Sequence, residues 1–425
     1  MQHTKSNTQM KPLLVKEGFL VSSDLKDRPL KRGVSLFWSQ WGGRFWSAGT
    51  IRSLAESWSP DFIRLPIGSH EDDLGYIKDE AYAITRAIMA IDEALANGVY
   101  VIVDCHDHDA VNHPLNASIL LSKIAAKYGD HPGILYEIVN EPLFVTWEEI
   151  KVYAEFIIPE IRRHAPNAVC LIGTPDWCTD LNGAFHNPVD LPNVMYTYHF
   201  YSASHQREHR ENLDYFLQRD LPVFVSECGA STYTGNGKVD YQDFDKWLDF
   251  LETKHSVPWC AWSLMDKGES SSMLVEGACG MFLDQLENIT DYGLFMLGRI
   301  KNPLPEDENW APYRKGYTSR FPDALEEREA IASLMSRTIQ VPKALLLSFT
   351  RSIFYNIEDN NVALYTAWLA NSWNKIDHGT RKEISKYIME RYQEELQRDC
   401  SPGNLWALRR LVDSIVFLQK GQAIA

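Results

Sequence analysis

The stretch VMYTYHFYSASHQREHRENLDYFLQRDLPVFVSECG, residues 194–229, contains the repeating unit from which the fold can be predicted. It begins and ends with apolar runs, Val194–Tyr201 and Pro222–Gly229, which have the length and the Val, Phe and Tyr content of buried strands. A polar, amphipathic segment connects the two runs. Strands joined through a helical segment are typical of parallel sheets, because a parallel pair needs a crossover connection.

The same alternation extends from residue 31 to residue 265. Six further apolar runs predict strands: Leu30–Phe37, Phe62–Ile67, Val99–His106, Ile134–Glu141, Ala168–Gly173 and Trp259–Met265. Helical periodicity is clear at Ile84–Asn97 and Tyr241–His255, and Ile289–Ile300 supplies a last helix. Eight strands, each followed by a helix, close into a parallel barrel. The sequence therefore predicts an α/β protein with a (β/α)8 TIM barrel.

The chain divides into four predicted parts. Residues 1–30 form a polar lead-in, and residues 31–302 form the barrel. Residues 303–323 are rich in proline and lack hydrophobic periodicity, which is typical of a linker. Residues 324–425 have helical periodicity throughout and predict a small all-α domain. Aromatic residues at helical spacing in this domain are more typical of a core than of a ligand site. It could bind a protein partner or self-associate.

Composition limits the partners and the setting of the protein. The 42 Lys and Arg residues against 57 Asp and Glu give a net charge of −15, which disfavours nucleic acid as a partner. No run approaches the roughly 18 apolar residues that a membrane span needs. The first residues show no signal-peptide pattern, and seven cysteines suggest reduced thiols. We expect a cytoplasmic protein or export without a recognisable signal; an extracellular location is the alternative.

Polar residues cluster at the carboxyl ends of the predicted strands, where barrel enzymes place their catalytic groups. These residues are Arg64, Asp104, His106, Asn140, Glu141, His199, Tyr201, Glu227 and Trp262. Glu141 and Glu227 follow the fourth and seventh strands, so they face each other across the barrel mouth. A facing carboxylate pair is the machinery of glycoside hydrolysis, in which one group protonates the leaving oxygen and the other attacks or activates water.

Seven motifs over about residues 33–300 carry a resemblance to a known family. They are Ile63-Arg64, Val103–His106, Ile138–Pro142, Tyr198–Tyr201, Val225–Glu227, Trp259–Leu264 and Asp266–Ser272. A single Asn-Glu-Pro is a weak signal, whereas seven motifs in order are specific. The chain resembles glycoside hydrolase family 5 and, within it, the bacterial endoglucanase branch.

The resemblance implies a retaining endo-β-1,4-glucanase that needs no cofactor and no metal and acts on a β-linked glucan or oligosaccharide. Glu227 is then the nucleophile and Glu141 the acid/base, with carboxyl groups about 5 to 5.5 Å apart. Asn140 would bind the sugar 2-hydroxyl. Arg64 and Tyr201 would keep Glu227 ionised, because a cation and a hydrogen-bond donor both stabilise a carboxylate.

The resemblance also implies a substrate-binding surface. His199 would neighbour Glu141, and His106 would contact sugar hydroxyls at the cleavage point. Trp262 would form an apolar floor there, because a sugar ring can stack on an indole. Further along the glycan, the family places stacking tryptophans at the positions of Trp41 and Trp177, and polar contacts at those of Lys267 and Glu269.

Three residues depart from the family pattern. Phe37 stands where the branch usually has His, and Cys105 and Cys228 stand where it usually has Trp. A metal site built from both cysteines and His108 is an alternative, but the spacing lacks paired ligands. Two functional alternatives also stay open. The substrate could be mannan, xyloglucan or mixed-linkage glucan, or the barrel could be a catalytically weak glycan-binding protein.

Overall fold

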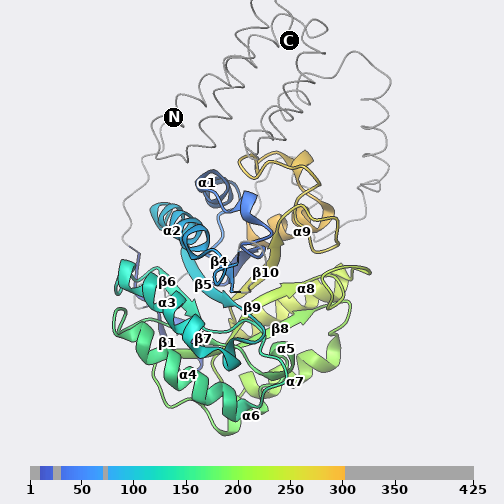
Figure 1. Ribbon diagram of the computed structural model, residues 1–425. Coiled ribbons are helices and arrows are strands. Elements are labelled where there is room, and N and C mark those ends of the chain that lie inside the picture. The colour runs from blue at the N-terminus through green and yellow to red at the C-terminus, as the bar shows by residue number, and fades with distance from the viewer. Residues whose placement is uncertain (1–9, 23–29, 70–74, 302–425) are drawn as a thin grey trace, which may run out of the picture. The chain divides into compact units, whose positions relative to one another are not determined.

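In the computed structural model, the described residues are 10–22, 30–69 and 75–301. They form a (β/α)8 TIM barrel whose eight parallel strands close in the order β10-β3-β4-β5-β6-β7-β8-β9, so the predicted barrel is confirmed (Figure 1). The predicted linker, residues 303–323, and the predicted all-α domain, residues 324–425, lie outside the described residues.

The barrel strands agree with the eight predicted runs. They are β3 (Arg32–Leu36), β4 (Phe62–Gly68), β5 (Tyr100–His106), β6 (Ile134–Glu137), β7 (Cys170–Ile172), β8 (Val194–Tyr201), β9 (Val223–Gly229) and β10 (Trp259–Leu264). Almost all of their residues are buried, because helices cover the outside of the sheet and side chains fill the inside. This double burial explains why the runs are apolar throughout rather than alternating.

The predicted fourth strand, Ile134–Glu141, is too long. Strand β6 ends at Glu137, so Asn140 and Glu141 lie in the segment that follows it. This segment passes close to Gly173, where a Cβ atom would lie 2.7 Å from the Val139 carbonyl oxygen. The backbone bends at residues 138 and 140, and Asn140 and Glu141 line the cleft at the carboxyl ends of the strands.

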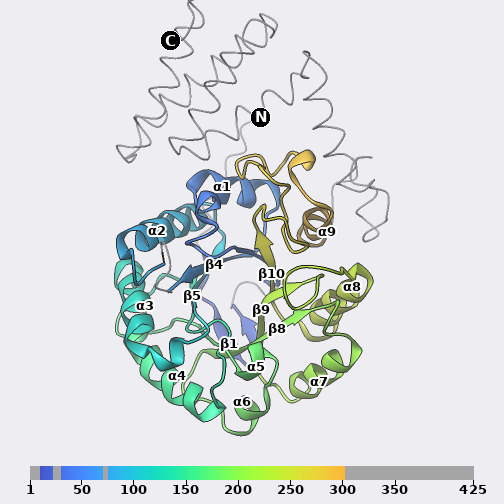
Figure 2. The same ribbon diagram turned by 45° about the vertical axis from the view of Figure 1, so that its right-hand side comes forward.

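Helices surround the strands (Figure 2). They are α1 (Ala48–Ser57), α2 (Glu80–Ala96), α3 (Pro114–Tyr128), α4 (Trp147–Arg162), α5 (Pro175–Cys178), α6 (Asn182–His186), α7 (Arg207–Leu217), α8 (Tyr241–Asp249) and α9 (Asp291–Ile300). The predicted helix Tyr241–His255 is α8 continued by a π-helical turn, Phe250–His255. Helix α4 begins with a capping box between Thr146 and Glu149. Within the described ranges, the helices are too short or too polar to cross a membrane.

A β-hairpin covers the amino-terminal end of the barrel. Its strands, β1 (Leu14–Lys16) and β2 (Phe19–Val21), lie within the predicted lead-in and are too short to produce a periodic signal. Leu13 packs among buried residues near the first positions of the strands, such as Phe62 and Tyr100. The Tyr100 hydroxyl also donates a hydrogen bond to the Lys11 carbonyl, at 2.8 Å. The described part of the lead-in is therefore integral to the barrel core.

We expect Leu13→Ala to lower the free energy of unfolding by about 2 to 4 kcal/mol, because it leaves a cavity in this cluster. Leu13 is 6% exposed, whereas its neighbour Leu14 is 45% exposed and serves as the matched control. Leu14→Ala should change stability by less than about 0.5 kcal/mol. Urea denaturation of both variants measures the difference, and equal effects would contradict a core role for the hairpin.

Candidate active site

A cleft of about 480 Å³ opens at the carboxyl ends of the strands. Nine predicted site residues line it: Trp41, His106, Asn140, Glu141, Tyr201, Glu227, Trp262, Lys267 and Glu269. Two others, Arg64 and His199, are buried and contact the cleft carboxylates from below. Trp177 is half exposed and is not among the lining side chains. Eleven of the twelve predicted residues thus line one concave site or contact its carboxylates, and Trp177 does not line it.

Glu227, on β9, is held at both carboxylate oxygens. Its Oε1 accepts a hydrogen bond from the Tyr201 hydroxyl at 2.6 Å, and its Oε2 accepts one from Arg64 Nη1 at 2.9 Å. Burial raises the pKa of Tyr201 well above its ordinary value, so the phenol keeps its proton and acts as a donor. These two contacts fix the carboxylate in one orientation at the cleft floor.

Arg64, on β4, is fully buried and contacts three acidic side chains. Its Nε donates to Glu137 Oε2 at 2.7 Å, and its Nη2 lies 3.0 Å from Asp104 Oδ2 and donates to Asn140 Oδ1 at 2.5 Å. Burial alone would lower the pKa of Arg64, but the three acidic neighbours, including Glu227, raise it well above its ordinary value. The guanidinium therefore stays charged and supplies the cation that buried carboxylates need.

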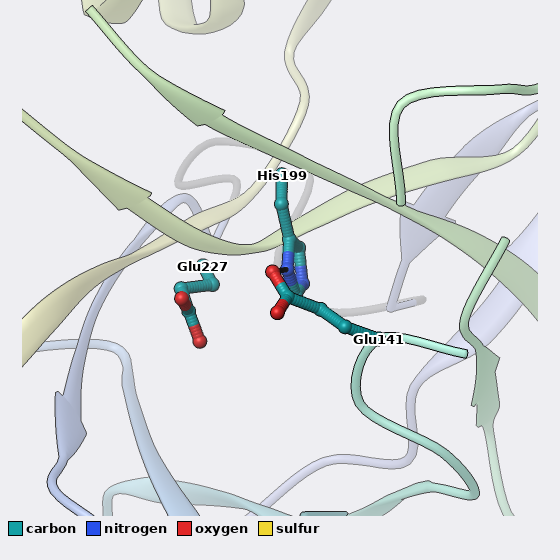
Figure 3. Close-up of side chains that lie close together, drawn as sticks. All are labelled: Glu141, His199 and Glu227. Carbon is teal, nitrogen blue, oxygen red and sulfur yellow. Dashed lines mark hydrogen bonds and ion pairs between the residues drawn. The ribbon is translucent and has the colours of Figure 1, made fainter. Parts of the chain in front are cut away.

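Glu141 has a different environment from Glu227. Its carboxylate lies beside the His199 ring (Figure 3). The distance from Glu141 Oε1 to His199 Nδ1 is 2.8 Å, and the Glu141 side chain is 12% exposed. Burial raises the pKa of Glu141 to about 7; His108 and Arg64 oppose the rise and Glu137 adds to it. Burial lowers the pKa of His199 to about 4. Near neutral pH the imidazole is uncharged, and Glu141 can both give and take a proton.

The two glutamates are close enough for a shared reaction centre. Ligand atoms of Glu141, His199 and Glu227 lie within 4.8 Å of one another, so one oxygen of each carboxylate falls inside that distance. Carboxyl groups about 5 to 5.5 Å apart fit direct attack on the sugar, whereas a water between them needs roughly 6.5 to 9.5 Å. The short separation fits the retaining geometry.

Aromatic side chains line the cleft on either side of His106. The Trp262 ring stacks on the His106 ring, with 5.4 Å between the ring centres. The Trp38 ring meets the His106 ring edge-on, with 4.0 Å between the ring centres. Phe37 contacts Trp262 at 5.3 Å, and Trp41, half exposed, contacts Trp38 at 5.1 Å. Such a surface offers flat apolar faces to a sugar ring.

Polar side chains lie at the edge of this aromatic surface. Lys267 Nζ and Glu269 Oε2 form an ion pair at 2.8 Å. The same Nζ lies 5.3 Å from the centre of the Phe37 ring. Hydroxyl groups of a bound sugar would therefore meet charged groups beside an apolar one.

Several site residues were missed by sequence reasoning. Trp38 and Tyr233 line the cleft beside predicted residues, and Glu137 and Ser226 contact the predicted ones from inside the barrel. Glu137 carried a usable signal, because a charged residue inside a buried apolar run needs a partner. Ser226 carried none, since small polar residues are common in barrel strands.

The group Glu141, His199 and Glu227 could by proximity hold a metal ion. However, both nitrogens of His199 and both oxygens of Glu227 already have hydrogen-bond partners, which account for the arrangement. Among the described residues, the weighed alternative of Cys105, Cys228 and His108 does not form a metal-binding group. Burial raises the pKa of both thiols well above the ordinary value.

Comparisons with known proteins agree with this geometry. A family model described as "Cellulase (glycosyl hydrolase family 5)" matches residues 24–268. Endoglucanase A of Butyrivibrio fibrisolvens is 34% identical over 297 residues, which are 68% of each chain. Endoglucanase MaCel5A of a Microbulbifer species is 34% identical over 64% of this chain and 54% of its own length. The chain spans about half to two thirds of the curated relatives it matches.

A similar solved structure is the catalytic domain of endoglucanase Cel5A from Thermobifida fusca, in complex with cellotetraose. It has 30% sequence identity and a TM-score of 0.64, and the match covers 68% of this chain and 97% of that one.

The raised pKa of Glu141 predicts a pH-dependent cost to stability. Between pH 4.5, its ordinary pKa, and about 7, the folded protein keeps a proton that the unfolded chain releases. The free energy of unfolding therefore falls as pH rises through this window. Relative to wild type, Glu141→Gln should gain roughly 2 to 3 kcal/mol between pH 4.5 and pH 8. Urea denaturation at both pH values tests this, and a pH-independent difference would contradict it.

Proposed function

The chain belongs to glycosyl hydrolase family 5, and on that premise we propose that it is a retaining endo-β-1,4-glucanase that cuts internal bonds of a β-linked glucan. The observation that carries the proposal is the pair formed by Glu141 and Glu227. Their carboxylates face the same space at short range, yet one is held by Arg64 and Tyr201 and the other by a neutral His199. Two carboxyl groups in unlike environments can take the two roles of a glycosidase.

In the first step, Glu227 attacks the anomeric carbon of the sugar at the cleavage point. The bond from that carbon to the glycosidic oxygen breaks, and Glu141 gives its proton to the departing oxygen. The shortened glycan leaves with a new hydroxyl, and the remaining sugar is joined to Glu227 as an ester. Asn140, held by Arg64, lies beside the pair and offers its amide N–H to the 2-hydroxyl.

In the second step, water replaces the departed glycan. Glu141, now ionised, takes a proton from the water while the oxygen attacks the anomeric carbon and the ester bond to Glu227 breaks. Both carboxyl groups return to their starting states. The configuration at the anomeric carbon is retained because it is inverted twice.

A β-1,4-linked glucan fits the cleft chemistry. Trp262, Trp38 and Trp41 provide flat apolar faces, while Lys267 and Glu269 provide charged partners for hydroxyl groups. The similar proteins are endoglucanases, and one was solved with cellotetraose. Phe37 cannot hydrogen-bond a hydroxyl, so we propose that the glucan is held near the cleavage point by stacking more than by polar contacts.

For residues 324–425, which lie outside the described part of the chain, we propose from the sequence pattern a helical module that binds a protein partner or self-associates. A cytoplasmic location is likewise a proposal. It is supported by five buried cysteines of the described ranges that form no disulfide bond: Cys105, Cys170, Cys178, Cys228 and Cys260.

Glu227→Gln should reduce turnover of an aryl β-cellobioside by about 10,000-fold or more, because it removes the nucleophile. A fluorinated cellobioside should trap an ester on Glu227 of the wild type, which mass spectrometry of peptides can locate. A label on another residue would contradict the assignment.

Reducing-sugar release over a panel of cellulose, mannan, xyloglucan and mixed-linkage glucan then identifies the substrate. No release from any of them would favour a binding role.

Glu141→Ala should slow hydrolysis of cello-oligosaccharides by roughly 100- to 10,000-fold, since the leaving alcohol needs a proton. An aryl glycoside with an acidic leaving group should be affected less in its first step. Azide should restore turnover of this aryl glycoside by Glu141→Ala and give a β-glycosyl azide, because an anionic nucleophile needs no general base. Absence of rescue would argue against Glu141 as the acid/base.

Trp41→Ala should raise KM for cello-oligosaccharides about tenfold with little change in kcat, because stacking binds ground state and transition state alike. Trp41→Phe keeps a smaller ring and should have an intermediate effect. Steady-state kinetics on cellotetraose measures both variants. An unchanged KM would remove Trp41 from the substrate-binding surface.

A further inference from the structure

A chain of buried hydrogen bonds leads from the Glu141 carboxyl group to the barrel interior. His199 Nδ1 lies 2.8 Å from Glu141 Oε1, and His199 Nε2 lies 2.9 Å from the Ser226 hydroxyl. Ser226 in turn donates to Glu137 Oε1 at 2.6 Å. The other three residues in this series of hydrogen bonds, His199, Ser226 and Glu137, are at most 2% exposed. They come from β6, β8 and β9; β8 and β9 are neighbours in the barrel, and β7 separates β6 from β8.

The donors and acceptors along this chain can be ordered from its inner end. Glu137 accepts at both oxygens, from Arg64 Nε and from Ser226. Ser226 has a single hydroxyl proton, and the contact with Glu137 uses it. Toward His199 the Ser226 oxygen can then only accept, so the hydrogen must be on His199 Nε2. In a neutral imidazole, the other nitrogen, Nδ1, is an acceptor.

We infer that Glu137 and Ser226 are positioning residues that hold His199 in the tautomer protonated at Nε2, so that its Nδ1 accepts the acidic proton of Glu141. Neither residue lines the cleft, so they act through His199. In this tautomer, ionised Glu141 faces a lone pair instead of a donor. We call the hydrogen-bonded series Glu137, Ser226, His199 and Glu141 the relay. It favours a protonated Glu141 before cleavage and a strongly basic Glu141 carboxylate after it.

Other charges act on the same pair and must be separated from the relay. The titratable or charged groups facing Glu141 and His199 come from β4, β5, β6, β8, β9, α5 and the loop after β5. They are Arg64, Asp104, Glu137, Tyr201, Glu227, Cys178 and His108. Of these, Glu137 belongs to the relay. The effect of its charge and the effect of its hydrogen bond to Ser226 must therefore be separated with two different variants.

Ser226→Ala breaks the relay but keeps the charge of Glu137. His199 can then carry its proton on Nδ1 and donate to ionised Glu141, which lowers the pKa of that carboxyl. The basic limb of the kcat/KM profile should move to lower pH by about one pH unit. Glu137→Gln should move it in the same direction, because an amide donor reverses each hydrogen bond in the relay and a negative charge is lost.

The matched control is Ser35→Ala on β3. Ser35 is also a fully buried barrel-strand serine, but its hydroxyl donates to the Leu36 carbonyl, outside the relay. The basic limb of the kcat/KM profile of Ser35→Ala should stay at the wild-type pH. Ser226→Thr restores a hydroxyl and should return the limb toward the wild-type pH. A shift in Glu137→Gln without one in Ser226→Ala would show a direct charge effect and overturn the relay.

A second readout needs no activity. In protein labelled with ¹⁵N-histidine, the His199 signals, assigned by their loss in His199→Asn, should show a protonated Nε2 and an unprotonated Nδ1. Ser226→Ala should change this pattern. A wild-type His199 protonated at Nδ1 would overturn the inference. The catalytic meaning of the relay rests on the proposed function, but absence of glycan turnover would refute that function without deciding the tautomer.

Discussion

The site depends on one buried cation, the guanidinium of Arg64. Three acidic side chains, Asp104, Glu137 and Glu227, lie within its reach inside a barrel that excludes water. Without a fixed cation, such a cluster would have to take up protons or unfold, because isolated carboxylates are costly to bury. Arg64 also contacts Asn140, so a single residue on β4 organises groups that lie on β5, β6 and β9 and in the segment after β6. The strands supply the positions, and the guanidinium sets the charge.

The division of labour between the two cleft glutamates follows from what touches each of them. Arg64 and the Tyr201 hydroxyl both donate to Glu227, whereas Glu141 is opposite a histidine that burial keeps neutral. Identical side chains thereby occupy different environments, as the two roles in a double displacement require. The protein achieves this by burial and by the orientation of neighbouring side chains.

Sequence reasoning located much of the site, because catalytic groups of a barrel follow its strands and strand runs are visible as apolar segments. The sequence therefore predicts that Glu141 and Glu227 face each other, and in the structure an oxygen of each lies within 4.8 Å of the other. Sequence reasoning could not show that β6 ends at Glu137, because Ile138 and Val139 continue the apolar run. Glu137 could have been found as a charged residue inside an apolar run, whereas Ser226 gave no such signal. The hairpin β1–β2 was missed because three-residue strands have too little length for periodicity.

The hairpin has a practical consequence for anyone who divides this chain into pieces. The family match starts at residue 24 and stops at residue 268, so a fragment cut at those limits would omit both the hairpin and α9. The apolar floor formed by Phe62, Tyr100 and their neighbours would then be open to solvent. Exposed surfaces of this kind promote aggregation. The family match therefore contains both catalytic glutamates but omits two elements that contact the barrel.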